Sequence, residues 1–111
     1  MVGILVSLLL TALGSSAGSP TEIADPAPEG TSAGRTVASQ SGCLACHTFG
    51  AVGNDGPGPD LTTIGARLSR REIERSVRVG PGIMPSYAGL KESDPQEFRD
   101  LIDYLAALGG R

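Results

Sequence analysis

The sequence predicts a small all-α domain whose centre is filled by something other than its own side chains. Two segments carry helix start signals followed by apolar residues at helical spacing, and the stretches between them are dense in Gly and Pro. Of the 111 residues only 4% are aromatic, none is Trp, and Gly and Pro number 16 and 8. A domain this small buries too little surface to offset its chain entropy comfortably. We therefore expect a disulfide, a metal or a large apolar cofactor in the core.

The first helix signal is a capping box. Ser69 is followed three residues later by Glu72, and Ile73 and Val77 recur at a spacing of four behind it. An N-cap hydroxyl and a carboxylate three residues on satisfy the free amides at a helix start. The pattern predicts a helix over about 70–79.

The second signal is stronger. Asp94 is suited to the N-cap, Pro95 to the first helical position, and Glu97 lies three residues after the cap. Gly109 and Gly110 supply the stop. The residues that mark one apolar face of this helix are Phe98, Leu101, Ile102, Leu105 and Leu108.

The remaining elements are shorter. We expect a helix over 34–41 and two Gly- and Pro-rich loops over 49–61 and 80–90, with no clear strand. The prediction is thus an all-α domain of three or more helices wrapped around a hollow, with Gly/Pro-rich loops.

The chain divides into three parts. Residues 1–17 are almost entirely apolar or small and end in Ser and Ala, which predicts an export signal. The run is shorter than the roughly 20 residues that a membrane helix needs, and no basic residue precedes Arg35, so a truncated membrane anchor with a misassigned start is the alternative. Residues 18–33 are rich in Pro, Ser and Gly and are expected to form a flexible tether. The folded domain is expected over 34–111.

The charges indicate no nucleic-acid partner. The formal net charge is -3, and the tether carries Glu22, Asp25 and Glu29. The basic and acidic residues of the domain itself balance in number, so no net positive charge points to a nucleic-acid partner.

The chemistry is in Cys43-Leu44-Ala45-Cys46-His47. On a helical turn both thiols and the imidazole project toward one side. Two thiols can add to the two vinyl groups of a haem while the adjacent imidazole ligates iron, and C-x-x-C-H indicates that attachment. A redox-active C-x-x-C expects a βαβ context, a zinc site needs a fourth ligand that the chain lacks, and an inert disulfide leaves His47 without a role.

The order of motifs resembles the class I cytochrome c family over residues 34 to about 109. The likeness includes the attachment motif, Gly58-Pro59-Asp60-Leu61, Met84-Pro85-Ser86-Tyr87 and a closing amphipathic helix. It implies one covalent haem c, with His47 as the proximal and Met84 as the distal axial ligand. It also implies that the Pro59 carbonyl accepts a hydrogen bond from the second ring nitrogen of His47.

Met84 is also singled out by its own position. It is the only Met besides the initiator and lies between Gly80-Pro81-Gly82 and Pro85, which suits a loop. The alternative is a Met that fills a gap in the core. Candidates to pack on the porphyrin are Leu61, Leu68, Ile83 and Leu90, and Tyr104 is expected to cross the small residues of 34–38.

Five arginines recur at helical spacing: Arg67, Arg70, Arg71, Arg75 and Arg78. They form either a solvated face supported by pairs such as Glu74 with Arg78, or a docking surface for a redox partner protein. Arg67 could instead pair with a haem propionate.

These features predict a one-electron carrier, exported to the periplasm or the outer face of a bacterial cytoplasmic membrane, and not an enzyme. With protein ligands at both axial positions, iron has no open site for substrate. The rivals are an exported thiol–disulfide oxidoreductase that uses Cys43 and Cys46, and a haem sensor or enzyme module in which a ligand displaces Met84.

Overall fold

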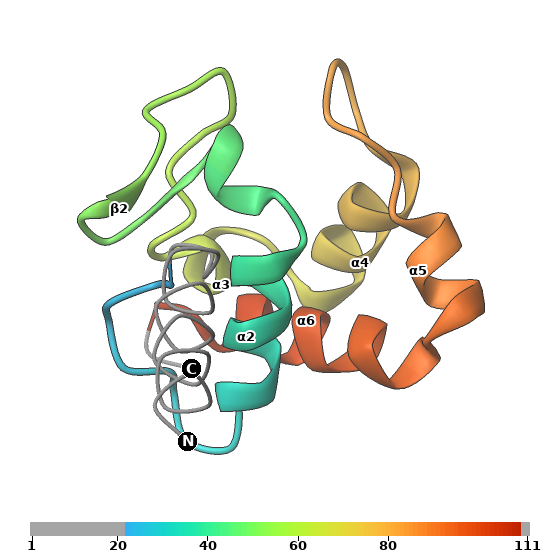
Figure 1. Cartoon of the computed structure of the whole chain (residues 1–111), viewed down its shortest axis with the longest axis horizontal. Helices are drawn as coiled ribbons and strands as arrows, with labels where there is room; N and C mark the ends of the chain where they lie inside the picture. Colours follow the sequence, from blue (N-terminus) through green and yellow to red (C-terminus); the bar gives the residue numbers. More distant parts are fainter. Residues whose placement is uncertain (1–21, 110–111) are drawn as a thin grey trace, which may run out of the picture.

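Five α-helices, one 3₁₀ turn and one small hairpin make up residues 22–109, the part of the chain that the computed structural model describes (Figure 1). The expected signal over 1–17 lies outside these residues. In chain order the elements are α2 (Ser32–Gln40), η1 (Cys43–Ala45), β1 (Thr48–Phe49), β2 (Val52–Gly53), α3 (Ile64–Arg67), α4 (Arg70–Val79), α5 (Ala88–Ser93) and α6 (Pro95–Ala107). The predicted all-α class is confirmed.

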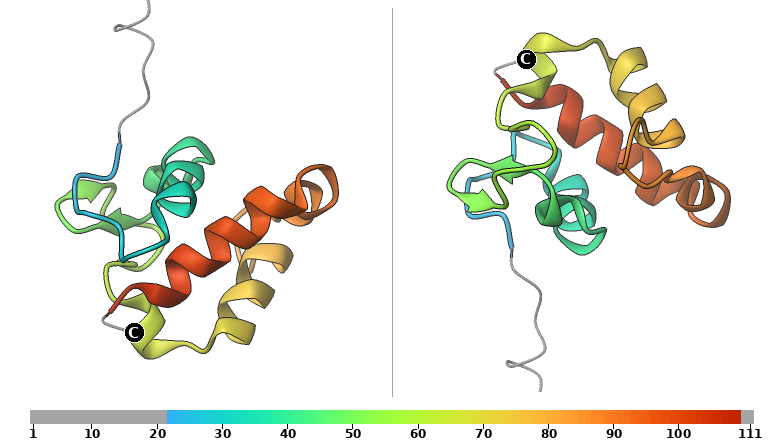
Figure 2. Two further views of the ribbon diagram at one scale, coloured as in Figure 1. Left: turned by 90° about the horizontal axis from the view of Figure 1, so that it is seen from below. Right: turned by 90° about the horizontal axis from the view of Figure 1, so that it is seen from above.

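Helix α6 is the centre of the packing. It contacts α2, α3, α4 and α5, and the two views of Figure 2 show it running between α2 and α4. The Asp94 carboxylate accepts from the Glu97 amide at 3.1 Å and Pro95 opens the helix, as the sequence predicts. Its buried side chains are Phe98, Leu101, Ile102, Tyr104 and Leu105. This apolar face supplies much of the core.

The crossing of α2 and α6 requires small residues on α2. A Cβ at Gly34 would lie 2.5 Å from the Tyr104 Cβ, and Ala38 is fully buried. Phe49 stacks on Tyr104 with ring centroids 6.1 Å apart. The expected crossing of Tyr104 over this segment is present, although α2 begins two residues before the predicted start at 34.

Helix α4 has the predicted bounds and the predicted cap. The Ser69 amide donates to the Glu72 carboxylate at 2.9 Å, and the Glu72 amide donates to the Ser69 hydroxyl at 3.2 Å. The hydrogen bond from the Ser69 amide is the largest cause of the lowered pKa of Glu72. Ile73 and Val77 are buried, and Gly80 ends the helix with a φ of 72°.

The prediction of no clear strand is wrong. Thr48 pairs with Gly53 and Phe49 with Val52 in an antiparallel hairpin, because Gly50 takes a φ of 63° and allows a tight turn. Two further helices were also missed. Helix α3 is a single turn, and α5 begins within the loop predicted over 80–90 although no side chain caps it.

The segment 22–31 differs from the expected tether. Ile23 is 3% exposed and belongs to the core, and its amide donates to the Ser39 hydroxyl at 3.3 Å. Arg35 donates to the Asp25 carbonyl at 3.0 Å. One apolar side chain and two anchored main-chain groups therefore hold this part of the chain against the domain. No helix within residues 22–109 is long and apolar enough to span a bilayer.

Candidate functional site

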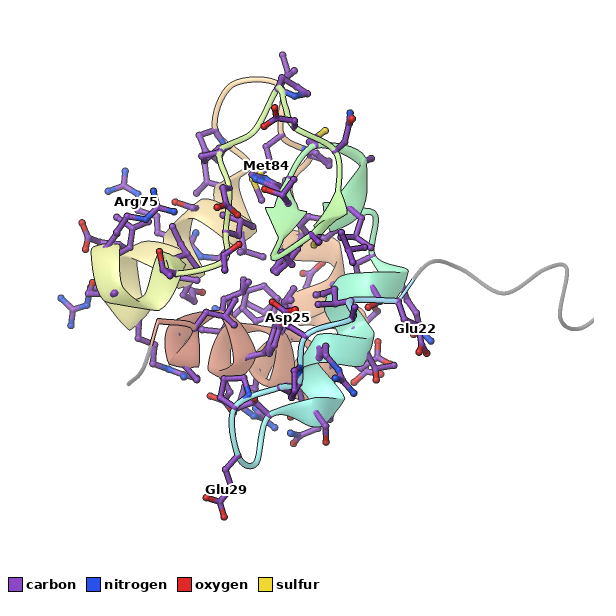
Figure 3. The ribbon with its side chains drawn as sticks, turned by 90° about the vertical axis from the view of Figure 1, so that its left-hand side faces the viewer. Glu22, Asp25, Glu29, Arg75 and Met84 are labelled. Atoms are coloured by element: carbon purple, nitrogen blue, oxygen red, sulfur yellow. The ribbon has the colours of Figure 1, made fainter. Side chains whose placement is uncertain are left out.

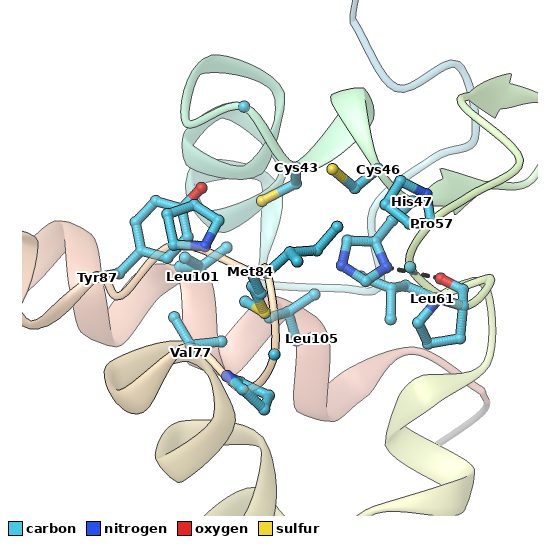
Figure 4. A pocket seen from close by; sticks show the side chains of 17 residues that line it. Cys43, Cys46, His47, Pro57, Leu61, Val77, Met84, Tyr87, Leu101 and Leu105 are labelled. Atoms are coloured by element: carbon cyan, nitrogen blue, oxygen red, sulfur yellow. Dashed lines mark hydrogen bonds between the residues drawn. The ribbon is translucent and has the colours of Figure 1, made fainter.

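An apolar pocket of about 310 Å³ lies between two segments far apart in the sequence (Figure 4). One is the proximal segment, residues 42–62, and the other is the distal loop, residues 80–87. Val77, Leu101 and Leu105 contribute from α4 and α6. A second hollow of about 160 Å³ shares much of this lining and adds Leu68 and Ile73. The volume is in the range of sites that hold a small molecule or cofactor.

Cys43, Cys46 and His47 all line this pocket. Gly42 begins η1 with a φ of 87°, and the His47 amide donates to the Cys43 carbonyl at 3.0 Å, so a tight turn directs the three side chains to one side. Both thiols are free and half-buried. The geometry suits two covalent attachments next to one ligand.

The thiol chemistry does not suit a redox-active pair. Burial raises the pKa of the Cys43 thiol to about 11, whereas reactive thiols have a lowered pKa. Among residues 22–109 no group of three or more His, Cys, Asp or Glu side chains is placed to hold a metal ion, as a zinc site would require.

The His47 ring is held in one orientation. It is 9% exposed, and its Nδ1 lies 2.7 Å from the Pro59 carbonyl oxygen. A carbonyl only accepts, so Nδ1 carries the proton and Nε2 keeps its lone pair for a ligand. A Cβ at Gly58 would lie 2.6 Å from Nδ1, so only glycine admits the ring here. The hydrogen bond implied by the family resemblance is present in the structure.

Asp60 organises the chain around Pro59. Its carboxylate accepts from the Thr48 hydroxyl at 2.9 Å and from the Thr62 hydroxyl and amide at 2.5 and 3.0 Å. These bonds, chiefly those from Thr62, lower the pKa of Asp60. Arg67 donates to the Asp60 carbonyl at 2.5 Å, so its guanidinium braces the loop. It lines neither hollow, and its pairing with a haem propionate stays a prediction.

Met84 is half-buried, packs against the core and lines both hollows. Its amide donates to the Pro81 carbonyl at 3.1 Å. A Cβ at Gly80 would lie 2.6 Å from the Met84 carbonyl oxygen, so the distal loop doubles back tightly on itself. The loop thereby presents the thioether to the same pocket as His47.

The residues expected to pack on the porphyrin differ in whether they line the two hollows. Leu61 lines both hollows and Leu68 the smaller one, whereas Leu90 lines neither. Ile83 borders the larger hollow but is 81% exposed, so it lies at the rim. Sequence reasoning assigned Leu101 and Leu105 only to a helix face and missed Tyr87 as a wall residue. The apolar spacing of Leu101 and Leu105 predicted that they are buried, but it did not indicate which cavity they face.

The predicted basic face is partly neutralised. Arg70 pairs with Asp103 at 2.5 Å, and Arg78 pairs with Glu74 at 3.2 Å. Glu74 also accepts from Lys91, which is the largest cause of its lowered pKa. Within residues 22–109 we find no ion pair for Arg71 or Arg75. Figure 3 shows Arg75 extending from α4, away from Glu22 and Glu29 on the N-terminal segment.

The residues around the pocket fit a haem attached through two thioethers, since an apolar hollow, paired thiols and an imidazole with a free Nε2 occur together. Fold and site define a monohaem c-type cytochrome domain that carries electrons and holds covalent haem c. A comparison with protein families matches residues 29–105 to "Cytochrome C oxidase, cbb3-type, subunit III", which is most of the chain. The chain belongs to this family of respiratory cytochromes. No curated protein matches the sequence.

Proposed function

We propose that Cys43 and Cys46 hold haem c through two thioether bonds, and that His47 and Met84 supply its two axial ligands. The observation that carries the proposal is the convergence of these four side chains on one apolar pocket from segments nearly forty residues apart. Imidazole with thioether is a known axial pair of c-type cytochromes.

The protein's work in this proposal is to fix the ligands. When bound, the haem supplies an Fe(III)/Fe(II) couple that takes up one electron at a time. Pro59 holds the imidazole through Nδ1, and the wall of Val77, Leu101 and Leu105 keeps water from the pocket. Apolar surroundings and a thioether ligand both favour the ferrous state, so we expect a fairly high reduction potential.

With both axial positions filled by protein, the domain has no site at which a substrate could reach iron. It is therefore a carrier and not an enzyme. The alternative is a module in which an external ligand displaces Met84. Carbon monoxide added to the reduced protein tests this, since a filled site should leave the spectrum unchanged and an open site should shift it at once.

Covalent attachment is tested separately. Treatment with acidified acetone should leave the haem on the polypeptide, and a pyridine haemochrome spectrum should show both vinyl groups saturated. Haem that extracts into the solvent would overturn the attachment. If the absorption spectrum shows no haem, the alternative of a thiol–disulfide oxidoreductase is favoured instead.

We further propose that the domain works outside the cytoplasm, in the periplasm or at the outer face of the cytoplasmic membrane, and that the apolar N-terminal run of 1–17 directs it there. If that run is kept, it is the domain's membrane anchor. The intact mass of the protein from its native host distinguishes the two cases. A mass lacking these residues shows a cleaved signal, and a mass that includes them shows an anchor.

We also propose that the redox partner docks at α4 through the basic face, chiefly through Arg71 and Arg75, for which we find neither an ion pair nor a hydrogen bond to a carbonyl within 22–109. Such charges raise the encounter rate with an acidic surface. Replacing both by Gln should slow oxidation of the reduced protein by host membranes at low salt and weaken its salt dependence. Arg99→Gln on α6 is the matched control and should change neither.

A further inference from the structure

The distal loop is joined to α4 at its end. The Tyr87 amide donates to the Val77 carbonyl at 2.9 Å, and the Ser86 hydroxyl donates to the Arg78 carbonyl at 2.6 Å. Both bonds lie on the same side of the pocket as the loop itself. They fix the loop to its own neighbouring helix but do not span the pocket.

One hydrogen bond does span it. The Tyr87 hydroxyl donates to the Ser41 carbonyl at 2.5 Å, across 46 residues of sequence. Ser41 is the C-cap of α2 and lies two residues before Cys43. Among residues 22–109 we find no other hydrogen bond between residues 80–87 and the segment that bears the cysteines. Tyr87 itself lines the pocket beside Cys43 (Figure 4).

The carbonyl of Ser41 is a well-placed anchor. Ser41 directly follows α2, the helix that crosses α6 at Gly34, where there is no room for even a Cβ. A carbonyl at a helix C-terminus also lacks a partner within the helix and readily accepts from a side chain. The Tyr87 hydroxyl thereby connects the loop to the close crossing of α2 and α6.

We propose that Tyr87 is a positioning residue for the distal ligand. Its hydroxyl ties the distal loop to the end of α2 and so keeps Met84 at iron. This inference rests on the proposed function, in which Met84 is the sixth ligand. Burial raises the pKa of Tyr87 above its usual value, so the hydroxyl remains a donor at neutral pH.

The size of the effect follows from the bond. A net contribution of about 1 kcal/mol for one such hydrogen bond corresponds to about a fivefold change in the fraction of molecules with the loop displaced. Iron becomes accessible to an external ligand only in those molecules. Removing the hydroxyl should therefore raise the rate and affinity of external ligand binding together, by about fivefold.

The experiment uses the haem-loaded protein and imidazole as the probe of the ferric state. Tyr87→Phe should bind imidazole about fivefold faster than wild type. Tyr104→Phe removes the hydroxyl of the other tyrosine, which lies in the α2–α6 crossing and lines neither hollow, and should bind at the wild-type rate. Combined with Met84→Ala, the Tyr87 change should add nothing, because the site is then already open.

The outcomes separate this inference from the proposed function. If Tyr87→Phe binds imidazole at the wild-type rate while Met84→Ala binds readily, the role of Tyr87 is overturned and the ligand assignment stands. If Met84→Ala also leaves binding unchanged, the ligand assignment itself fails. Should Tyr87→Phe not fold, proton NMR of the reduced wild-type protein decides. A slowly exchanging Tyr87 hydroxyl proton close to Ser41 supports the inference, and its absence overturns it.

Discussion

The two sides of the pocket are built in different ways. On the proximal segment His47 is 9% exposed, bonded to Pro59, and hemmed in by Gly58. On the distal loop Met84 lies next to Ile83, which is 81% exposed, and the loop is fastened near its ends. Of the two proposed axial ligands, His47 is thus preset by the fold, whereas the position of Met84 depends on how well a loop is held. Substitutions on the proximal side should therefore be poorly tolerated, whereas substitutions on the distal side should have graded effects.

The largest effect should come from preventing haem attachment, because both sides of the pocket pack against the haem. A Cys43→Ala/Cys46→Ala variant cannot attach haem, and the pocket wall then has no partner for its apolar surface. We expect this domain to be largely unfolded, because a chain so poor in aromatic residues gains much of its core from the cofactor. Circular dichroism during heating and the dispersion of amide resonances measure this. A cooperative melt without haem would contradict it.

Replacing Met84 should change the chemistry while keeping the fold. Met84→Ala should open a coordination site to cyanide or carbon monoxide. Met84→His should fill it with a harder donor and lower the reduction potential by at least about 100 mV, within the ~0.8 V range that axial ligands cover. Redox titration and ligand-binding spectra provide the measurements. Unchanged potential and binding in both variants would show that Met84 only packs.

Gly58→Ala tests the preset side. The new Cβ would meet the His47 ring, so either the ring or the loop must move and the bond to Pro59 is strained. We expect a loss of about 1–3 kcal/mol in the free energy of unfolding of the haem-bound protein, as for other overpacked sites. Gly89→Ala in α5 is the control, since a Cβ there meets nothing within 4 Å. Equal stability of the two variants would remove the steric argument.

The smallest effect concerns Asp60, which is exposed and supports the loop around Pro59. Its pKa is lowered in the folded state, chiefly by Thr62, so its carboxylate stabilises the fold above the unfolded pKa of about 3.9. That stability is lost as pH falls through the folded pKa. The urea midpoint of Asp60→Asn should therefore lie below that of wild type at pH 7, and the difference between the two midpoints should shrink as the pH falls below about 3.9. A difference in urea midpoint that does not change with pH would refute this role of the Asp60 carboxylate.

The sequence predicted the features that depend on neighbours in the chain. The capping box at Ser69 and the Asp94-Pro95 start are local signals, and both helices begin where these residues indicate. The attachment motif likewise lies within five consecutive residues. Tyr87 was missed as a wall residue because its partner Ser41 is 46 residues away and is a main-chain carbonyl, which leaves no mark in the side-chain pattern.

Ile23 was missed for a related reason. A single apolar residue in a Pro- and Gly-rich stretch shows no periodicity, and its burial depends on a core that only the assembled fold creates. The hairpin itself rests on the positive φ of Gly50 and not on a run of strand-forming residues. The burial of Ile23 and the formation of the hairpin thus depend on the folded chain and not on local sequence propensity.

The burial of Ile23 also limits how far the domain can travel from a membrane. If residues 1–17 remain as an anchor, only residues 18–22 separate that anchor from the first buried side chain, Ile23, and not 18–33. Five extended residues span at most about 18 Å. The haem would then be confined to a shallow layer above the bilayer, at a high effective concentration for a partner fixed in the same membrane. Such a cytochrome would exchange electrons with its immediate neighbours and would not shuttle between distant complexes.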